Sequence, residues 1–406
     1  MQSQTHRAEL FAPFDWYRTM RAAQPVSFDE KANVWHVFGY DDVSRVLMDH
    51  EAFSSDRGSV TGGPAVDDPR LSTMFTMDPP RHRQMRSLVS LAFTPATVNR
   101  VLPRIGSIAD GLLDRVADRG EMDVVADIAY PLPVTVIAEL LGIPTERQAD
   151  FRRWADAAIA AIGGREAGTE ISGPGADEPF KGPDPESEIG RALAEMYAYL
   201  GEIVEERRRA PKDDLVSNLV TAELDGARLG LNELIGFCGL LLSAGHNTTA
   251  QLITNAVLCI DENPGVLDRL RADPALLPDA IEEVLRYLSP AQAMMRFART
   301  DVELGGQKIA AGASVFPWMG SANRDGAEFP DPDRFDIQRQ PNRHLGFGWG
   351  IHFCLGAALA RAEGRIALTA MMQRMGGAWR IADEPLERIP WFFMFGVKHL
   401  PLRWEA

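Results

Sequence analysis

Residues 347–356 read Phe347-Gly348-Trp349-Gly350-Ile351-His352-Phe353-Cys354-Leu355-Gly356. One cysteine stands in a glycine-rich loop, directly before a segment whose apolar spacing predicts a long helix over about 355–375. The N-terminus of a helix carries unpaired N–H groups and partial positive charge, so we expect a lowered pKa for the Cys354 thiol. Because glycines let the backbone approach a flat group closely, this loop is suited to bind a metal through the Cys354 thiolate.

Other functions of Cys354 remain open at this point. A lone cysteine beside a glycine-rich turn is often a buried structural residue. A hydrolase nucleophile would need a general base, for which His352 is close in sequence. Zinc is disfavoured because it takes three or four nitrogen or sulfur ligands, and the chain's three cysteines form no C-x-x-C pair.

The pattern Phe347-Gly348-x-Gly350-x-His352-x-Cys354-x-Gly356 resembles the haem-binding loop of the cytochrome P450 family. The resemblance extends from about residue 34 to the C-terminus. It implies that Cys354 is the axial thiolate ligand of the iron of haem b. It also implies that four further members of this loop contact the cofactor: Phe347, Gly348, His352 and Gly356.

The chain as a whole predicts a mainly α protein with a smaller β region, in a single domain over residues 1–406. Strands are expected near 34–38, 301–306 and 314–316, and helical spacing is found over 41–47, 81 to about 160, 188–209, 231–260 and 278–287. The helix over 231–260 would extend about 45 Å and is apolar around much of its surface, so we expect it to be buried. Glycine and proline interrupt residues 163–188, which predicts a flexible lid over the entrance for substrate.

A polar stretch, Ala244-Gly245-His246-Asn247-Thr248-Thr249, interrupts the long helix. Its hydroxyls could simply bond to carbonyls one turn back. The resemblance implies instead that small Ala244 and Gly245 open a groove for dioxygen and that Thr248 is the oxygen-activating alcohol. The family has an acid where this chain has Asn247, and an amide cannot relay a proton as a carboxylate does. We therefore expect Thr248 and ordered water to carry protons, with Asn247 holding the network.

Basic residues in matching order along the chain favour haem further. The two propionates of haem need cations or donors. The resemblance assigns this role to His82, Arg86, Arg296 and His352. Taken singly, each is as consistent with a solvated surface residue.

Glu283 and Arg286 occupy positions i and i+3 of one predicted helix. Alone, such a pair is typical of a weak surface ion pair. Its position about 70 residues before the cysteine resembles the E-x-x-R pair of the family, with Arg334 as the third member of a structural triad. We expect these three residues to support folding and to take no part in the chemistry.

The composition narrows the partners. The 406 residues include 42 basic and 57 acidic side chains, a net charge of −15, which disfavours nucleic acid and anionic membranes as partners. No apolar run is long enough to span a bilayer, and residues 1–13 lack the apolar core of a secretory signal. Three cysteines are too few for a disulfide framework and favour a reducing compartment, so we expect a cytoplasmic protein, and we expect it to be a monomer.

The resemblance implies a haem-thiolate monooxygenase that activates dioxygen with two externally supplied electrons and oxidises a small apolar or aromatic substrate. The residues expected to line the substrate site are Ala291, Met294, Met295, Phe393 and Met394. Because 406 residues leave no room for a fused reductase, we expect a separate ferredoxin or flavodoxin-type donor. Basic residues that could guide this acidic partner are Arg81, Arg83, Arg361 and Arg365.

Two alternatives stay open. A peroxide-driven haem enzyme is the nearer one, and Asn247 in place of the acid favours it slightly. A haem-binding gas sensor is the more distant one, and no appended signalling segment supports it.

Overall fold

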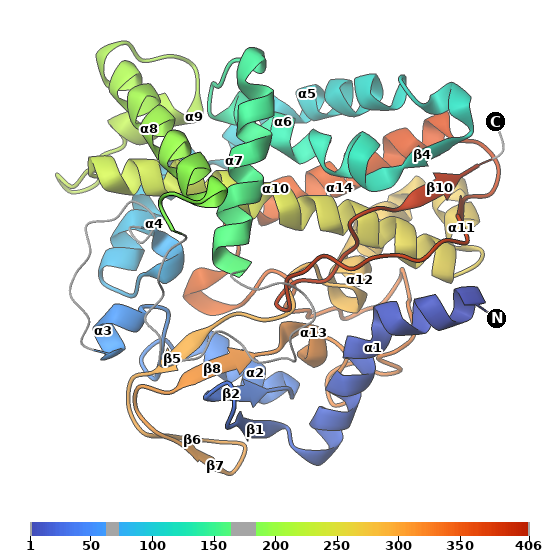
Figure 1. Cartoon of the computed structure of the whole chain (residues 1–406), viewed down its shortest axis with the longest axis horizontal. Helices are drawn as coiled ribbons and strands as arrows, with labels where there is room; N and C mark the ends of the chain where they lie inside the picture. Colours follow the sequence, from blue (N-terminus) through green and yellow to red (C-terminus); the bar gives the residue numbers. More distant parts are fainter. Residues whose placement is uncertain (1, 62–72, 164–183, 405–406) are drawn as a thin grey trace.

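The protein is mainly α with a small β region, as the sequence predicts (Figure 1). The computed structural model describes residues 2–61, 73–163 and 184–404. Most of the predicted lid, residues 164–183, lies outside the described residues. The helices are α1 (Gln2–Ala23), α2 (Tyr40–Met48), α3 (Arg57–Thr61), α4 (Arg81–Ala92), α5 (Pro95–Leu113), α6 (Pro131–Leu140), α7 (Gln148–Gly163), α8 (Glu188–Arg209), α9 (Leu215–Thr221), α10 (Leu231–Glu262), α11 (Val266–Ala272), α12 (Leu277–Tyr287), α13 (Met319–Ala322) and α14 (Ala357–Arg374).

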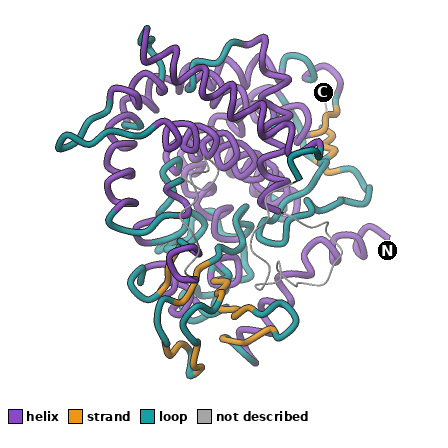
Figure 2. The backbone as a smooth tube through the Cα atoms, turned by 60° about the vertical axis from the view of Figure 1, so that its left-hand side comes forward, coloured by secondary structure: helices purple, strands orange, loops and turns teal. Residues whose placement is uncertain are grey.

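The strands are short and lie in separate places, with a larger group below the helices and a second group near the C-terminus (Figure 2). They are β1 (Val26–Asp29), β2 (Val34–Val37), β3 (Phe53–Ser54), β4 (Glu121–Asp123), β5 (Arg296–Ala298), β6 (Val302–Leu304), β7 (Gln307–Ile309), β8 (Ser314–Pro317), β9 (Arg380–Ile381) and β10 (Pro401–Arg403).

The largest sheet has the strand order β1-β2-β8-β5-β3. Its β2 and β8 are parallel, with Val34 opposite Ser314, while β3 pairs with β5 in the antiparallel sense. This pairing places the residues after β3 beside the start of β5. The sheet therefore brings together segments that are more than 200 positions apart in the sequence.

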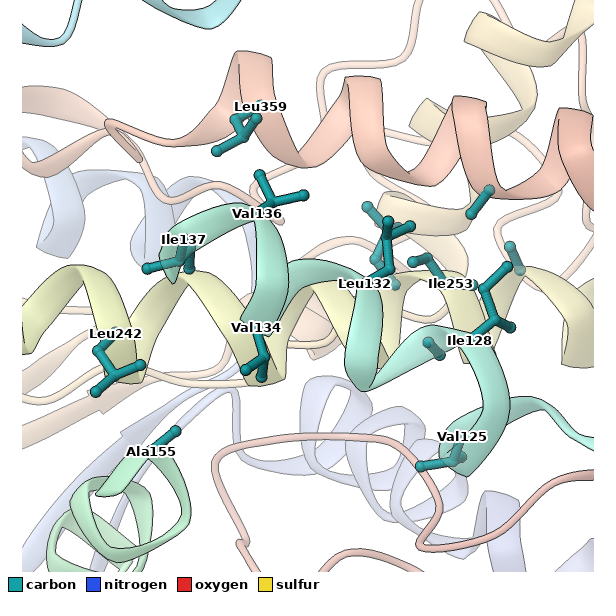
Figure 3. Packing of buried hydrophobic residues seen from close by; sticks show 14 of the residues in the cluster. Val125, Ile128, Leu132, Val134, Val136, Ile137, Ala155, Leu242, Ile253 and Leu359 are labelled. Carbon is teal, nitrogen blue, oxygen red and sulfur yellow. The ribbon is translucent and has the colours of Figure 1, made fainter. Parts of the chain in front are cut away.

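Helix α10 forms the centre of the helical part, with 32 residues and a length of about 48 Å. It packs against α6, α8 and α14, and most of its side chains are buried. In Figure 3, Ile137 and Val134 of α6 lie along α10 near Leu242, and Leu359 of α14 lies above them. This apolar contact explains why a helix interrupted by polar residues is still stable.

The predicted ends of the elements are confirmed within two residues in most cases. Helix α8 has the predicted bounds, because Ser187 accepts a hydrogen bond from the Gly190 N–H at its start. Helix α2 begins one residue earlier than predicted, at Tyr40, with Gly39 as its N-cap. Strand β4 was not predicted, since its partner β10 lies about 280 positions further along the sequence. No helix in the described ranges has both the length and the apolarity needed to cross a membrane.

Candidate active site

The Cys354 loop is held by its own backbone. The Cys354 N–H donates to the Phe347 carbonyl at 2.9 Å, which closes the loop into a compact turn. Gly348 and Gly350 both have φ of 72°, a left-handed conformation that favours glycine. A Cβ on Gly350 would also lie 2.9 Å from the Leu47 carbonyl oxygen, so α2 leaves no space for a side chain there.

The prediction of a lowered pKa for Cys354 is wrong. Burial raises the pKa of this thiol, while the Gly356 N–H, Arg86 and Arg361 act in the opposite direction without outweighing it. Helix α14 begins only at Ala357, so the sulfur precedes the helical N–H groups by a short turn. The loss of water around the sulfur is the larger effect in this protein.

Four basic residues predicted from different parts of the sequence come together beside this loop. His82 and Arg86 lie on α4, Arg296 begins β5, and His352 precedes Cys354. The rings of His82 and His352 have centroids 4.3 Å apart. Burial, with the neighbouring arginines, lowers the pKa of His82 to about 4 and that of His352 to about 2, so both imidazoles are neutral at pH 7.

The cluster has unused hydrogen-bonding capacity. Nε2 of His82 is buried and has no hydrogen-bond partner among the described residues. Arg296 is 4% exposed, and its Nη1–H donates to the Met295 carbonyl at 2.8 Å. Burial lowers the pKa of Arg296 to about 10, which leaves it charged at pH 7. Buried donors of this kind suit an anionic group.

The buried carboxylate of Asp78 lies next to the cluster. Asp78 accepts hydrogen bonds from the Ser54 hydroxyl and, at 3.0 Å, from the Ser55 N–H, and it forms an ion pair with Arg299. The Ser55 hydroxyl in turn lies 3.0 Å from Nε2 of His352. The negative charge of Asp78 is thus already compensated by Arg299. Through Ser55, Asp78 also joins β3 and the start of α4 to His352 of the Cys354 loop.

The polar stretch of α10 has two different faces. Ala244 is exposed although its helix is mostly buried, and the Thr248 hydroxyl donates to the Ala244 carbonyl at 2.6 Å. Asn247 is 5% exposed. A Cβ on Gly245 would lie 2.5 Å from Cδ1 of Ile137, so the missing side chain of Gly245 allows α6 to pack closely. The groove for dioxygen at Ala244 and Gly245 stays a prediction.

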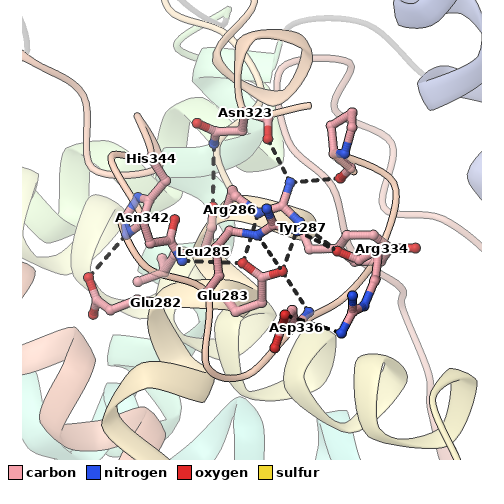
Figure 4. Close-up of polar contacts among 12 residues, drawn as sticks. Glu282, Glu283, Leu285, Arg286, Tyr287, Asn323, Arg334, Asp336, Asn342 and His344 are labelled. Atoms are coloured by element: carbon pink, nitrogen blue, oxygen red, sulfur yellow. Dashed lines mark hydrogen bonds and ion pairs between the residues drawn. The ribbon is translucent and has the colours of Figure 1, made fainter. Parts of the chain in front are cut away.

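Glu283 and Arg286 form a fully buried pair, but the predicted third member is wrong (Figure 4). Arg286 donates Nε–H and Nη2–H to the two carboxylate oxygens of Glu283 at 2.8 Å each. The side chain of Arg334 is 67% exposed and pairs with Asp336, and only its carbonyl accepts from Arg286. The arginine that reaches Glu283 is Arg339, at 3.3 Å.

Comparison with known proteins agrees with this arrangement. Residues 26–383 match the family model described as Cytochrome P450. The chain belongs to the cytochrome P450 family. It is an oxidoreductase of the monooxygenase type, and its family carries a haem group with a thiolate ligand.

Relatives of this P450 are similar over nearly their whole length. A putative cytochrome P450, YjiB, of Bacillus subtilis is 42% identical over 94% of this chain and 92% of its own. The erythromycin C-12 hydroxylase of Saccharopolyspora erythraea is 41% identical over 97% of this chain and 95% of its own. A crystal structure of CYP109E1 from Bacillus megaterium with testosterone has a TM-score of 0.84 at 40% identity, covering 97% of this chain and 99% of that one.

The two segments predicted to line the substrate site of this P450 pair with each other through their backbones. Ala291 forms a β-bridge with Met394, and the Gln292 N–H donates to the Phe393 carbonyl at 2.8 Å. Ala291, Met294, Met295 and Phe393 are partly exposed, whereas Met394 is 5% exposed and packs inward. The sequence predicted both segments but not that they pair.

The four arginines predicted to guide an electron donor divide into two pairs. Arg81 donates to Glu233 at 2.7 Å, and Arg361 forms a bidentate pair with Glu282 at 2.6 and 2.7 Å. Carboxylates of the same chain therefore compensate both charges, and a guiding role of the four arginines stays a prediction. Arg83 and Arg365 are exposed and make no ion pair among the described residues.

His246 is a residue whose environment the sequence did not reveal. Its ring has no exposed surface, and neither nitrogen has a hydrogen-bond partner in the described part of the chain. It stands edge-on to Tyr130 with ring centroids 4.3 Å apart, and the Tyr130 hydroxyl donates to Asp156 of α7. Burial lowers the pKa of His246 to about 3, with Arg152 adding to the effect.

Proposed function

We propose that this P450 binds haem b with Cys354 as the iron ligand. The observation that carries the proposal is the meeting of the Cys354 loop, with its own His352, and three basic side chains from two other parts of the sequence, which are His82 and Arg86 of α4 and Arg296 of β5. His82 keeps a buried nitrogen without a partner among the described residues, which fits an anionic group that completes the cluster. The residues present therefore fit haem, and Phe347, Gly348 and Gly356 shape the loop around the ligand sulfur.

The propionates of the cofactor are assigned to His82, Arg86, Arg296 and His352. Arg86 and Arg296 supply the charge, since the two histidines are neutral at pH 7 and act as hydrogen-bond donors. Two arginines match the two carboxylates of haem, so the buried charges balance.

Haem with a thiolate ligand supplies the oxygen-activating redox chemistry. The residues of this chain supply proton delivery and positioning. Thr248 holds its hydroxyl at the Ala244 carbonyl, on the exposed part of α10, where the hydroxyl oxygen can still accept a hydrogen bond. Asn247 carries no dissociable proton, so we assign proton transfer to Thr248 and ordered water, and to Asn247 the holding of that network.

The substrate class we propose is a small organic molecule that is largely apolar. Partly exposed Ala291, Met294, Met295 and Phe393 offer an apolar and aromatic surface that suits such a molecule. Similar proteins include an erythromycin C-12 hydroxylase and a P450 crystallised with testosterone. Hydroxylation or a related oxidation of such a compound is the proposed reaction.

The electrons are proposed to come from a separate ferredoxin or flavodoxin-type protein. Arg83 and Arg365 are the exposed cations available to an acidic partner. The enzyme is proposed to be a monomer in the cytoplasm, where its three free cysteines remain reduced.

The test is spectroscopic and then catalytic. The purified protein, once loaded with haem and reduced, should give a carbonyl adduct with the strongly red-shifted Soret band of thiolate ligation. A Cys354→Ser variant should lack this band. A wild-type protein without the band would overturn the proposal.

Peroxide-driven oxidation is the second candidate, favoured by Asn247 in the position of the family's acid. Turnover with hydrogen peroxide alone should be compared with turnover by reductant, electron donor and dioxygen. Faster turnover with peroxide alone would select the second candidate over the monooxygenase cycle.

A further inference from the structure

We propose that Glu282, a residue outside the E-x-x-R motif, positions the Cys354 loop. It does so through two contacts with the start of the loop, one made by Arg361 and one by His344. The proposal rests on the proposed function, because it concerns the loop that holds the iron ligand. Glu282 lies on α12 directly before Glu283, and its side chain is 27% exposed. Its contacts differ from those of its neighbour, which faces Arg286.

The first of these contacts is made by Arg361 of α14. Nε and Nη2 of Arg361 donate to the two carboxylate oxygens of Glu282 at 2.6 and 2.7 Å. Held in this way, the guanidinium lies 4.5 Å from the ring centre of Phe347, within the range of a cation–π contact. The Phe347 carbonyl accepts the Cys354 N–H at 2.9 Å, so the ring beneath Arg361 belongs to the residue that closes the loop.

The second of these contacts is made by His344. Nδ1 of His344 accepts the Gly346 N–H at 3.1 Å, so the ring's other nitrogen, Nε2, is the one that donates to Glu282, also at 3.1 Å (Figure 4). Gly346 is pressed against α12, since a Cβ there would lie 2.7 Å from the Leu285 carbonyl oxygen. The two contacts therefore act on Gly346 and Phe347, which are consecutive residues at the start of the loop.

The charge of Glu282 also matters for the sulfur. Burial raises the pKa of Glu282, but Arg361 and His344 outweigh it and lower that pKa to about 2, so the carboxylate is ionised at pH 7. Arg361 acts on the Cys354 thiol as a nearby positive charge. Glu282 compensates that charge, and its removal would leave Arg361 free to stabilise extra electron density on the reduced iron centre.

This arrangement gives Arg361 a role different from docking. The Arg361 guanidinium donates two hydrogen bonds to the Glu282 carboxylate and stacks on the Phe347 ring, so its position is fixed. A docking residue would offer its donors to the partner protein. The two roles predict different behaviour of the same variants.

The experiment uses the haem-loaded enzyme and the variants Glu282→Gln, Arg361→Gln and their combination. The matched control is Glu139→Gln, because Glu139 is 23% exposed and receives Nε of Arg104 at 2.8 and 3.0 Å on α6, away from the loop. One readout is the rate at which the reduced carbonyl adduct loses its red-shifted Soret band in mild denaturant. The other is the midpoint potential of the iron.

Glu282→Gln should lose the band about tenfold faster, since loss of a hydrogen bond to a charged group costs on the order of 1.5 kcal/mol. Its midpoint potential should be more positive than that of the wild type. Glu139→Gln should change neither readout. The combined variant should lose the band more slowly than two independent effects would predict, because both residues act through one contact.

Wild-type band stability and potential in Glu282→Gln would overturn the inference while leaving the proposed function intact. Absence of the red-shifted band in the wild type would instead overturn the proposed function. If Glu282→Gln does not fold, Arg361→Lys keeps the charge but loses the planar fork, and it should still destabilise the band. An Arg361→Gln variant that only slows reduction by the electron donor would identify a docking residue and contradict the inference.

Discussion

Arg286 donates two hydrogen bonds of 2.8 Å to Glu283, and neither side chain has any exposed surface. The remaining donors of Arg286 reach the carbonyls of Asn323, Pro332 and Arg334 at 2.8 to 3.0 Å. One guanidinium thus ties α12 to the segment that follows α13. A buried ion pair is stable in such a place because every charge and donor has a partner.

The first prediction separates Arg339 from Arg334. Arg339→Ala should lower the free energy of unfolding by about 3 kcal/mol, because it removes a buried partner of Glu283. Arg334→Ala should change it by less than about 0.5 kcal/mol, because the Arg334 side chain is mostly exposed. Denaturant unfolding followed by circular dichroism measures both, and equal effects of the two substitutions would show that the assignment of Arg339 is wrong.

The second prediction concerns proton delivery by Thr248. Thr248→Ala should reduce the product formed per electron consumed by about tenfold or more, since a positioned proton transfer contributes about 10²–10⁴-fold. Thr248→Ser keeps the hydroxyl that donates to the Ala244 carbonyl and should retain most of the coupling. Product and electron consumption are measured together in a reconstituted system.

Asn247 provides the companion test of that route. Asn247→Asp introduces a carboxylate beside Thr248 and should raise the product formed per electron. An unchanged rate and unchanged coupling would mean that the departure from the family pattern has no consequence. Thr248→Ala with wild-type coupling would exclude the hydroxyl from proton delivery.

The third prediction tests the support behind the propionate cluster. Ser55→Ala removes the hydroxyl that lies 3.0 Å from Nε2 of His352, so haem should transfer to an acceptor protein about fivefold faster, as for one neutral hydrogen bond of ~1 kcal/mol. Arg296→Met should accelerate the transfer more, because it also removes a buried charge. Ser59→Ala, at an exposed serine of α3, is the control and should match the wild type. Equal transfer rates for Ser55→Ala and the control would contradict the proposed support.

The fourth prediction is a pH dependence that arises from His246. Its pKa is about 3 in the folded protein and near the ordinary value of 6.5 in the unfolded chain. The unfolded state therefore binds a proton that the native state does not as the pH falls below 6.5. Stability should decrease in this range by about 1.4 kcal/mol per pH unit from this residue alone, until the pH approaches 3.

His246→Phe should remove this part of the acid sensitivity. The phenyl ring can keep the edge-on contact with Tyr130, and it carries no unpaired nitrogen. Unfolding free energies at pH 7 and pH 5 should differ less in the variant than in the wild type, while exposed His399→Gln should behave as the wild type. An equal pH difference in His246→Phe and the wild type would show that His246 is already protonated or solvated.

Local patterns were sufficient to predict much of this protein. Helix α8 and the long α10 follow from apolar spacing and their first residues, because these signals lie within a few turns of one another. The Cys354 loop and the Glu283–Arg286 pair are also contiguous in sequence. Such motifs carry their geometry with them, since glycine conformations and i, i+3 spacing are local properties.

Contacts between distant segments could not be predicted in the same way. The family resemblance pointed to Arg334 as the partner of Glu283, and only the path of the intervening chain decides that Arg339 is the buried one. Gly245 was expected to make room for dioxygen, but its role in packing depends on Ile137 of another helix. The same holds for Arg361, whose partner Glu282 is 79 positions away.

The amino-acid order by itself determined the family, the cysteine that we propose as the iron ligand and the order of the helices, because these depend on short patterns of residue type. Tertiary structure alone decided which charges are compensated and which nitrogens are buried. Burial raises the pKa of Cys354, against the prediction from its local sequence, and lowers the pKa of His246 to about 3. The physical reason is that the electrostatic energy of a group depends on the water removed from it, and packing between segments distant in the chain decides how much is removed.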